Sequence, residues 1–385
     1  MDNNKIAVVI IAYEREASLR RLLDSVSKAL YPEDTDIPLV ISVDKGNNDA
    51  VRALAESFEW KHGEKRVIAH DTRLGLKAHV LKCGDLCRDY GSVILLEDDL
   101  FVSPGYYLYT AEALRSAGDD ERVGGISLYD HLLNVHAREP FYAIDDGYDN
   151  YYMQFASSWG QAYNVRMWNG FRNWLSENDN KDISGTDMPK NVSGWSDKSW
   201  LKYNIRYLID KDMFFLYPRV SLTTNFMDEG EHSDRTNTDL QVPLMCGKKT
   251  GYRFSSPDNS MAVYDAFFEN LHLKKILAEA LDKGEKEVTV DIYGTKETGK
   301  TEGRYLLTSK SLAKKVIKSY GRYLRPADAN IIFDMRGNDI FLYDLHVQAK
   351  APAVNEADRL LYDYRAIRAE EMLKILKYRL FSRKK

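Results

Sequence analysis

The chain has 385 residues, and its 54 basic and 58 acidic side chains give a formal net charge of −4. This length allows two or three domains, and the near-neutral charge argues against a dedicated nucleic-acid-binding protein. The longest apolar run, Ile6–Tyr13, is far shorter than the roughly 20 residues that cross a bilayer. Three cysteines cannot form a disulfide framework, so we expect a cytoplasmic protein.

The first hundred residues alternate between strand and helix patterns. Apolar, β-branched runs predict strands at 5–13, 38–44, 66–70 and 92–96. Helical spacing of apolar residues predicts helices at 19–26, 50–58 and 77–87. Strands that alternate with crossover helices form a parallel sheet, so the fold class is α/β with a mostly parallel, Rossmann-like sheet and flanking helices.

Polar residues follow three of these strands, where ligands bind in such sheets. They are Tyr13-Glu14-Arg15, Asp44-Lys45-Gly46-Asn47 and Glu97-Asp98-Asp99. Three consecutive carboxylates repel one another unless a cation neutralises them, and one or two carboxylates together with substrate phosphates usually hold Mg²⁺ or Mn²⁺. The last group therefore indicates a metal site, and the alternative is a solvated acidic turn.

A competing motif is the segment Gly294–Thr301, which matches the phosphate-binding pattern G-x-x-x-x-G-K-[ST]. Such a loop requires a helix that begins at Lys300-Thr301. A strand pattern at 305–308 follows instead, which favours a hairpin connection.

Two segments in the middle of the chain also have the composition of a site. In 195–200, Asp197 lies between two tryptophans, and a carboxylate partly desolvated by aromatic rings can act as a general base. The alternative is that Asp197 caps a helix. The polar segment 222–240, which contains His232, has no apolar period and is typical of a functional lid.

The pattern changes again near residue 286. We predict a small accessory α+β domain at 286–385, with strands at 288–293, 305–308, 331–335 and 340–345, a helix at 311–323 and a hairpin turn at 336–339. Its last stretch, 361–385, has eight basic and three acidic residues and spaces its leucines as an amphipathic helix. Such a helix binds a membrane surface or a partner, or packs on its own domain.

Together these motifs resemble the nucleotide-sugar glycosyltransferases of the GT-A fold, and most of all the N-acetylglucosaminyltransferase I family of the Golgi. The likeness covers roughly residues 5–235. Its anchors are Ala12-Tyr13-Glu14-Arg15, Ser42-Val43-Asp44, Glu97-Asp98-Asp99-Leu100, Ser158-Trp159-Gly160, Trp195-Ser196-Asp197-Lys198-Ser199-Trp200 and Tyr217-Pro218-Arg219-Val220-Ser221. The segment 195–200 resembles the family's Trp-Asp-Asp-Trp segment, which contains the catalytic base. Where the family has two aspartates there, this chain has Ser196-Asp197.

The resemblance implies a role for each candidate. Asp99 would ligate Mn²⁺ or Mg²⁺, and Asp197 would take the proton of the acceptor. The donor would be bound by Ala12, Tyr13, Arg15, Asp44, Glu97 and Asp98, and His232 would reach the metal or the phosphate. The resemblance divides the glycosyltransferase part into a nucleotide-sugar-binding half (1–120) and an acceptor-binding half (121–280).

The implied activity is the inverting transfer of GlcNAc or a related hexose from a UDP-sugar to a saccharide hydroxyl, in bacterial surface polysaccharide synthesis. The acceptor would be a glycan or a lipid-linked saccharide at the inner membrane face, reached through the basic C-terminal helix.

Two alternative functions remain open. A nucleotidyltransferase usually has a glycine-rich turn after its first strand, which this chain lacks. A non-catalytic glycan-binding relative would lose the metal or base residues.

Overall fold

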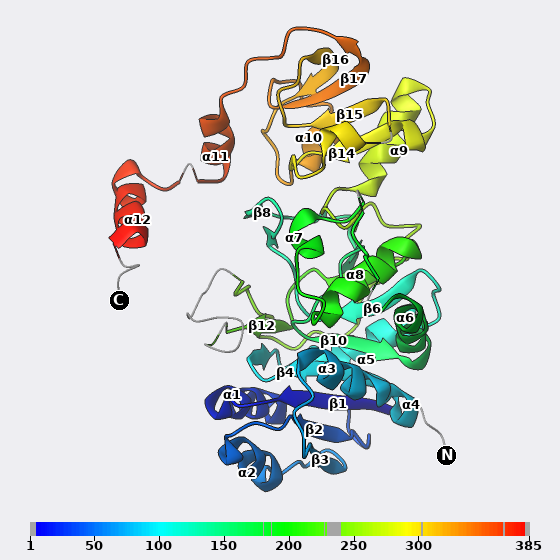
Figure 1. The fold of residues 1–385 in the computed structure, drawn as a ribbon, viewed down its shortest axis with the longest axis vertical. Helices are drawn as coiled ribbons and strands as arrows, with labels where there is room; N and C mark the ends of the chain where they lie inside the picture. The colour runs from blue at the N-terminus through cyan, green and yellow to red at the C-terminus, as the bar shows by residue number, and fades with distance from the viewer. Residues whose placement is uncertain are drawn as a thin grey trace. The chain divides into compact units, whose positions relative to one another are not determined.

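The computed structural model describes residues 5–179, 181–185, 187–226, 228, 240–301, 303–364 and 366–381. The chain folds into two compact units (Figure 1). The first unit comprises residues 1–136, 141–272 and 295–300, and the second comprises 137–140, 273–294 and 301–385.

A nine-stranded sheet in the order β13-β9-β11-β6-β10-β4-β1-β2-β3 forms the centre of the first unit. Its strands are β1 (Lys5–Ala12), β2 (Leu39–Val43), β3 (Lys65–Ala69), β4 (Gly91–Glu97), β6 (Val123–Ser127), β9 (Asn150–Met153), β10 (Gln161–Asn164), β11 (Phe214–Pro218) and β13 (Val263–Tyr264). β3, β2, β1 and β4 are parallel neighbours, and β10 runs antiparallel to both β4 and β6. β4 and β6 therefore point the same way, and β11 is parallel to β6.

The carboxyl ends of β1, β2, β4, β6 and β11 consequently lie along one side of the sheet, which we term the carboxyl edge. Four short strands lie outside the main sheet: β5 (Leu100–Val102), β12 (Thr223–Asn225), β7 (Leu133–Asn134) and β8 (Glu139–Pro140). β5 pairs with β12, which ties the segment after β4 to residues 223–225.

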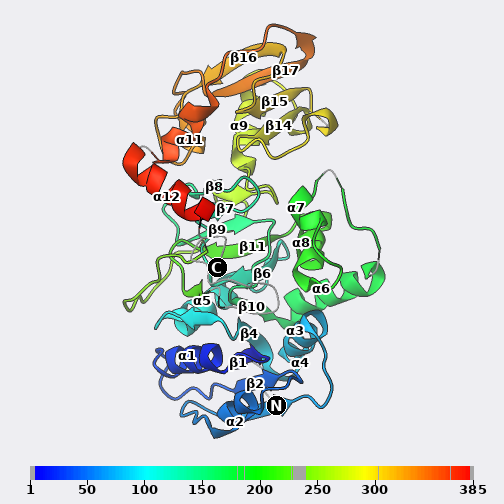
Figure 2. The ribbon, with the colours of Figure 1, turned by 60° about the vertical axis from the view of Figure 1, so that its left-hand side comes forward.

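Helices cover both faces of this sheet (Figure 2). α1 (Glu16–Ser27), α2 (Asp49–Ser57) and α5 (Tyr106–Ala117) lie on one side, and α3 (Leu76–Asp85), α4 (Cys87–Tyr90), α6 (Val165–Asn178) and α8 (Trp200–Asp210) on the other. A short helix, α7 (Lys190–Ser193), precedes α8. Because the sheet is covered twice, Ala7–Ala12 of β1 and all of β2 are buried, as their continuous apolar runs predict. The predicted α/β fold class is confirmed.

The second unit contains a four-stranded sheet in the order β14-β15-β17-β16. Its strands are β14 (Val288–Asp291), β15 (Tyr305–Thr308), β16 (Lys314–Tyr320) and β17 (Ile340–Gln348), and its helices are α9 (Leu271–Leu281), α10 (Asp328–Ile332), α11 (Glu356–Tyr364) and α12 (Ala369–Phe381). Leu273 and Leu277 of α9 share a buried core with Val290, Leu307 and Leu342 of the sheet. A short 3₁₀ turn occupies Glu285–Glu287 in this unit, and another occupies Thr298–Lys300, which belongs to the first unit.

Three local predictions for this region are wrong. The predicted helix at 311–323 is β16, because its β-branched pair Val316-Ile317 lies in a strand that pairs with β17. The predicted strand at 331–335 overlaps α10, where the side chain of Asn330 donates to two backbone carbonyls and accepts from two backbone amides. The turn at 336–339 therefore joins a helix to β17, not two strands.

The connection through Gly294–Thr301 also differs from the expected hairpin, since β14 and β15 are parallel. Residues 292–304 supply the dozen or so residues that a parallel crossover needs. Within them, Thr298–Lys300 is a single 3₁₀ turn and β15 begins at Tyr305. No α-helix follows the Gly-Lys-Thr triplet in the described part of this segment, which argues against a phosphate-binding loop.

The C-terminal helix α12 exposes its apolar side chains. Leu373, Ile375, Leu376, Leu380 and Phe381 are all between 48% and 76% exposed. Among the described residues, no helix is long and apolar enough to span a membrane.

Candidate active site

The ends of β1, β2 and β4 meet at the carboxyl edge. The backbone amide of Asp44 donates to the carbonyl of Ala12 at 2.9 Å, and that of Asp98 donates to the carbonyl of Ile11 at 3.1 Å. Three polar segments far apart in the sequence are thus adjacent, as their positions after parallel strands predict.

Arg15 binds the two aspartates that follow β4. Its guanidinium forms an ion pair with Asp98 and donates to Oδ2 of Asp99 at 3.1 Å. The backbone amide of Tyr13 lies 3.4 Å from Oδ2 of Asp98, whose side chain is only 4% exposed. Burial raises the pKa of Asp98 to about 6, although the charge of Arg15 opposes this shift.

Glu97 is the most perturbed carboxyl group of this cluster. Burial, followed by repulsion from Asp99 and Asp98, raises its pKa to about 8. The cluster Glu97-Asp98-Asp99, which we term the acidic edge, thus combines burial with repulsion between its carboxylates. A bound cation would relieve this repulsion.

Asp99 has the atom best placed to meet such a cation. Its Oδ1 is buried and has no hydrogen-bond partner, while its Oδ2 faces Arg15. Within the described residues, no group of three His, Cys, Asp or Glu side chains could hold a metal. Mg²⁺ and Mn²⁺ do not require such a group, because one or two carboxylates, substrate phosphates and water complete their coordination. The acidic edge fits a divalent cation held in this way.

Asp44 is buried and supports the loop before α3. Its Oδ1 accepts from the amides of Lys45 and Leu74, both at 2.8 Å, and its Oδ2 accepts from Gly75 at 2.9 Å. Gly75 precedes α3 with a φ of +77°, a conformation that favours glycine. Asp44 therefore shapes the start of α3, and its carboxylate retains lone pairs for a further contact.

Arg73 is a residue that sequence reasoning missed. Its guanidinium lies 5.1 Å from the ring centre of Tyr13, at the end of β1. The pair combines a flat ring and a cation, which suits a nucleotide. No local motif marks Arg73, because its contact with Tyr13 spans sixty residues of sequence.

Asp197 lies in a more open environment than the acidic edge. Its side chain is 77% exposed, and its Oδ1 accepts from Nζ of Lys202 at 3.0 Å. Nζ of Lys202 also donates to the carbonyl of Trp195 at 3.0 Å and belongs to a side chain only 9% exposed. The helix-cap alternative for Asp197 is wrong, because Ser199 caps α8 through its Oγ.

Lys77 links the Asp197 segment to the carboxyl edge. It lies two residues beyond Gly75, and its Nζ donates to the backbone carbonyl of Asp197 at 3.3 Å. The same ammonium forms an ion pair with Asp179 and lies 4.0 Å from the ring centre of Tyr203. The start of α3 therefore connects Asp44 with the backbone beside Asp197.

Asp130 is a second residue that the sequence did not reveal. It follows β6 at the carboxyl edge and accepts from the hydroxyl of Tyr151 at 3.0 Å. Burial raises its pKa to about 8. The signal was present, since Asp130 closely follows a strand, but Gly124-Gly125 obscures that strand's pattern.

His232 lies outside the described residues. Of its loop, Asp228 is described: it accepts from Oγ of Ser18 at 2.6 Å and forms an ion pair with Arg21, both on α1.

Part of the first unit matches a known protein family. Residues 7–164 match the family model described as "Glycosyl transferase family 2", whereas no curated protein matches the chain. The residues matched include β1, β2 and β4, with the acidic edge. The broader prediction of a glycosyltransferase is therefore confirmed, and the finer likeness to the N-acetylglucosaminyltransferase I family stays a prediction.

Similar solved structures include two of S. aureus TarS residues 1–349. One has a TM-score of 0.36 at 12% identity and covers 57% of this chain and 59% of that one. The other, in complex with UDP-GlcNAc, has a TM-score of 0.38 at 13% identity and covers 59% and 60%.

A third similar structure is the mannosyltransferase PcManGT from Pyrobaculum calidifontis in complex with GDP-Man and Mn²⁺. Its TM-score is 0.31 at 16% identity, and the match covers 45% of this chain and 46% of that one. The chain thus spans between 46% and 60% of the length of these three structures. All three TM-scores are below 0.5.

Proposed function

We propose, from the premise that this chain carries a glycosyltransferase family 2 domain, that it transfers a hexose from a UDP-sugar to a saccharide hydroxyl, with a divalent cation and with inversion. The observation that carries this proposal is the acidic edge, where Arg15 binds Asp98 and Asp99 and leaves Oδ1 of Asp99 buried without a partner. These groups lie at the end of the sheet where ligands of α/β proteins bind.

The donor would lie along the carboxyl edge. Tyr13 and Arg73 would receive the base, with Asp44 close to the nucleoside, and Arg15 would be shared between the aspartates and the diphosphate. Asp98 and Glu97 would accept hydrogen bonds from donor hydroxyls. Because Asp44 and Asp98 are already bonded to backbone amides, these groups would meet the donor in a fixed geometry, which reduces the entropy cost of binding.

Asp99 would be the protein ligand of Mn²⁺ or Mg²⁺. When bound, such a cation neutralises negative charge that develops on the diphosphate leaving group. The part of this chain is to present Oδ1 of Asp99 and to keep Asp98 in place through Arg15. The cation would supply the positive charge that allows the acidic edge and the anionic diphosphate of the donor to lie close together.

Asp197 would accept the proton of the acceptor hydroxyl as that oxygen attacks the anomeric carbon. Its exposed carboxylate is accessible to an acceptor that arrives from solvent. Lys202 holds the carboxylate by one oxygen, Oδ1, so Oδ2 is the oxygen that we assign to the acceptor proton. A single displacement with one base inverts the anomeric configuration.

The acceptor would be a glycan or a lipid-linked saccharide, in bacterial surface polysaccharide synthesis. The support for a lipid-linked acceptor is α12, whose exposed leucines and isoleucine lie beside Lys374 and Lys377. A helix with this composition would lie in the interface of an anionic membrane. Deleting residues 366–385 should then abolish sedimentation with vesicles that contain anionic lipid and leave donor binding unchanged.

The test of the donor site is a thermal-shift screen of UDP-sugars with Mn²⁺ or with EDTA. A ligand that binds only the folded state raises the melting temperature by mass action. We expect one UDP-sugar to stabilise the protein in Mn²⁺, and the effect to vanish in EDTA and in Asp99→Ala. Asp89→Ala, which removes an exposed carboxylate beside β4, is the matched control and should behave as the wild type.

The same samples separate the alternatives. Release of UDP from the stabilising sugar, dependent on Mn²⁺ and Asp99, would support catalysis. Stabilisation by free glycans but by no nucleotide would instead favour a glycan-binding protein and refute the proposal. Stabilisation by a nucleoside triphosphate and a sugar phosphate would favour a nucleotidyltransferase.

A further inference from the structure

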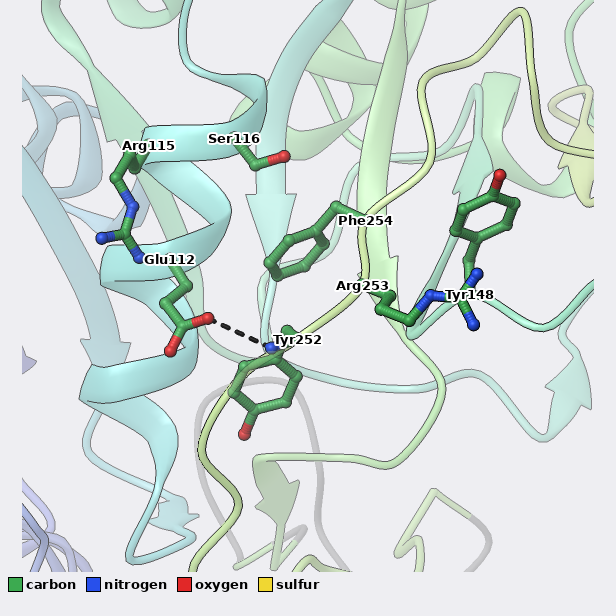
Figure 3. Close-up of a pocket in the computed structure, with 7 residues that line it drawn as sticks. All are labelled: Glu112, Arg115, Ser116, Tyr148, Tyr252, Arg253 and Phe254. Carbon is green, nitrogen blue, oxygen red and sulfur yellow. Dashed lines mark hydrogen bonds between the residues drawn. The ribbon is translucent and has the colours of Figure 1, made fainter.

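A polar, aromatic pocket lies along α5 in the first unit, outside the acidic edge. Its volume is about 410 Å³, within the range of small-molecule sites. Seven residues line it: Glu112, Arg115, Ser116, Tyr148, Tyr252, Arg253 and Phe254 (Figure 3). None of them is used by the proposed transfer reaction, so this pocket needs its own explanation.

The aromatic side of the pocket is a pair of stacked rings. Tyr252 and Phe254 lie 5.9 Å apart with an interplanar angle of 29°. The buried ring of Tyr109 contacts both edge-on, at 5.0 Å and 5.5 Å, and therefore supports the pair from the protein interior. Partly exposed aromatic faces next to polar groups suit the alternating apolar and hydroxyl surfaces of sugar rings.

Two arginines line the pocket, on opposite sides of the stacked rings (Figure 3). Arg115 extends from the last turn of α5, and Arg253 extends toward Tyr148, 5.5 Å from its ring centre (Figure 3). Both side chains are exposed, and within the described ranges neither takes part in an ion pair. Each guanidinium group offers donors that suit a carboxylate or a phosphate.

The loop that carries these residues is already fixed. A carboxylate oxygen of Glu112 accepts from the backbone amide of Tyr252 at 3.2 Å (Figure 3). Asp149 and Arg253 exchange two hydrogen bonds, both at 2.8 Å, and Asn150 accepts from the amide of Ser255, also at 2.8 Å. The pocket therefore exists before a ligand binds, which favours affinity.

We infer that this pocket is a second binding site, separate from the donor site, for an anionic saccharide: the sugar rings lie against Tyr252 and Phe254, and acidic groups are bound by Arg115 on one side of the rings and by Arg253 on the other. The inference stands on the pocket alone and does not depend on the transfer reaction proposed above.

The test is a titration followed by saturation-transfer NMR, with a hyaluronan tetrasaccharide and a phosphorylated disaccharide as the anionic probes. Chitotetraose is the uncharged sugar probe, and tripolyphosphate is the anion without a ring. We expect an anionic saccharide to bind at least about tenfold more tightly than chitotetraose or tripolyphosphate. The two anionic probes distinguish a carboxylate from a phosphate.

Three variants locate the site. Arg115→Gln and Arg253→Gln should each weaken binding about tenfold, and Tyr252→Ala should remove the saturation transfer to the sugar ring protons. Arg66→Gln changes an exposed arginine on β3 and is the matched control. Because Tyr252→Ala removes a ring from the stack, Tyr252→Phe keeps that stack and should still bind.

Several results would overturn the inference. The first is an affinity for tripolyphosphate equal to that for the anionic saccharides. The second is binding of an anionic saccharide that persists in both arginine variants, and the third is failure of both anionic saccharides to bind the wild type. UDP-sugar stabilisation in Mn²⁺ should be unchanged in Arg115→Gln, and Asp99→Ala should still bind the saccharide, so the failure of one site is distinguishable from failure of the other.

Discussion

The acidic edge and the segment that carries Asp197 both present carboxylates, yet they are built in opposite ways. Asp98 is buried and is held by Arg15 and by the amide of Tyr13. Asp197 is 77% exposed and is held by one lysine. A group that binds a cation and a diphosphate benefits from a fixed position, whereas a base must remain accessible to an acceptor that arrives later. In the proposed reaction, the donor site would therefore be preformed, and the acceptor would complete the site around Asp197.

The strongest test of this contrast is Asp197→Asn. Amide substitution keeps the shape and removes the base, and general base catalysis typically contributes about 10²- to 10⁴-fold. We expect transfer to fall by that factor while UDP-sugar binding in Mn²⁺ stays within about twofold of the wild type. Rates of UDP release with acceptor, together with donor titrations, measure both quantities.

The outcome for Asp99→Ala should be the reverse, with donor binding lost first. If Asp197→Asn weakened donor binding as much as Asp99→Ala, the two regions would not have separate roles. Unchanged transfer in Asp197→Asn would remove Asp197 from the mechanism and direct attention to Asp130.

Arg15→Ala tests whether the stability of the acidic edge depends on the guanidinium group of Arg15. Removal of one partner of a buried ion pair typically costs about 3 kcal/mol of stability, because an unpaired charge remains. We expect a loss of that order in urea unfolding. Added Mn²⁺ should recover more of the lost stability in Arg15→Ala than it adds to the wild type, since the cation would then be the main neutralising charge.

Arg20→Ala is the matched control, because Arg20 lies on α1 and forms an exposed pair with Glu16. It should cost less than about 1 kcal/mol. A loss in Arg15→Ala no larger than in this control would mean that the acidic edge does not rely on Arg15.

Asp130 sharpens the comparison, because it is a half-buried carboxyl at the same edge that accepts a hydrogen bond from the hydroxyl of Tyr151. Burial raises its pKa from 3.8 to about 8. The folded state therefore holds a proton that the unfolded state loses, and this contribution to stability is present below about pH 4 and declines as the pH rises to about 8. Asp130→Asn removes the titration.

We therefore expect Asp130→Asn to become more stable relative to the wild type as the pH rises from 5 to 9, by a few kcal/mol at most. Urea unfolding of both proteins at several pH values measures this. If the unfolding free energies of the two proteins changed equally with pH, Asp130 would be charged in the folded protein at neutral pH, like Asp98 beside Arg15.

The sequence predicted the acidic edge well, for a physical reason. A buried parallel strand has a continuous apolar sequence, and the first polar residue after it, Glu97 or Asp44 here, marks where the strand ends. The strand β6 was not predicted, because two glycines interrupt its apolar pattern. A Cβ on Gly124 would lie 2.6 Å from Leu208, and one on Gly125 would lie 2.5 Å from Phe215. Close packing on both faces thus removed the pattern that would have revealed Asp130.

The contacts made by Asp197 could not be predicted in the same way. Its link to Lys77 joins residues 120 positions apart, and local sequence patterns carry no information on such a pair. The wrong predictions in the second unit have the same origin. Residues 314–320 form a strand because β17 pairs with them, and tertiary pairing overrides local preference.

The smallest effect that we expect comes from Ser199, which caps α8 beside Asp197. Its Oγ accepts from the amide of Lys202 at 3.3 Å, so Ser199→Ala removes the cap and should cost about 1 kcal/mol of stability. Lys202 holds Asp197, so fraying at this end would also move the base. We expect the transfer rate to fall by less than about tenfold, with donor binding unchanged. Ser199→Asp, which retains a cap, should restore most of the stability and most of the transfer rate. A loss of donor binding in Ser199→Ala would instead mean that α8 supports the acidic edge as well, and that the two regions respond as one.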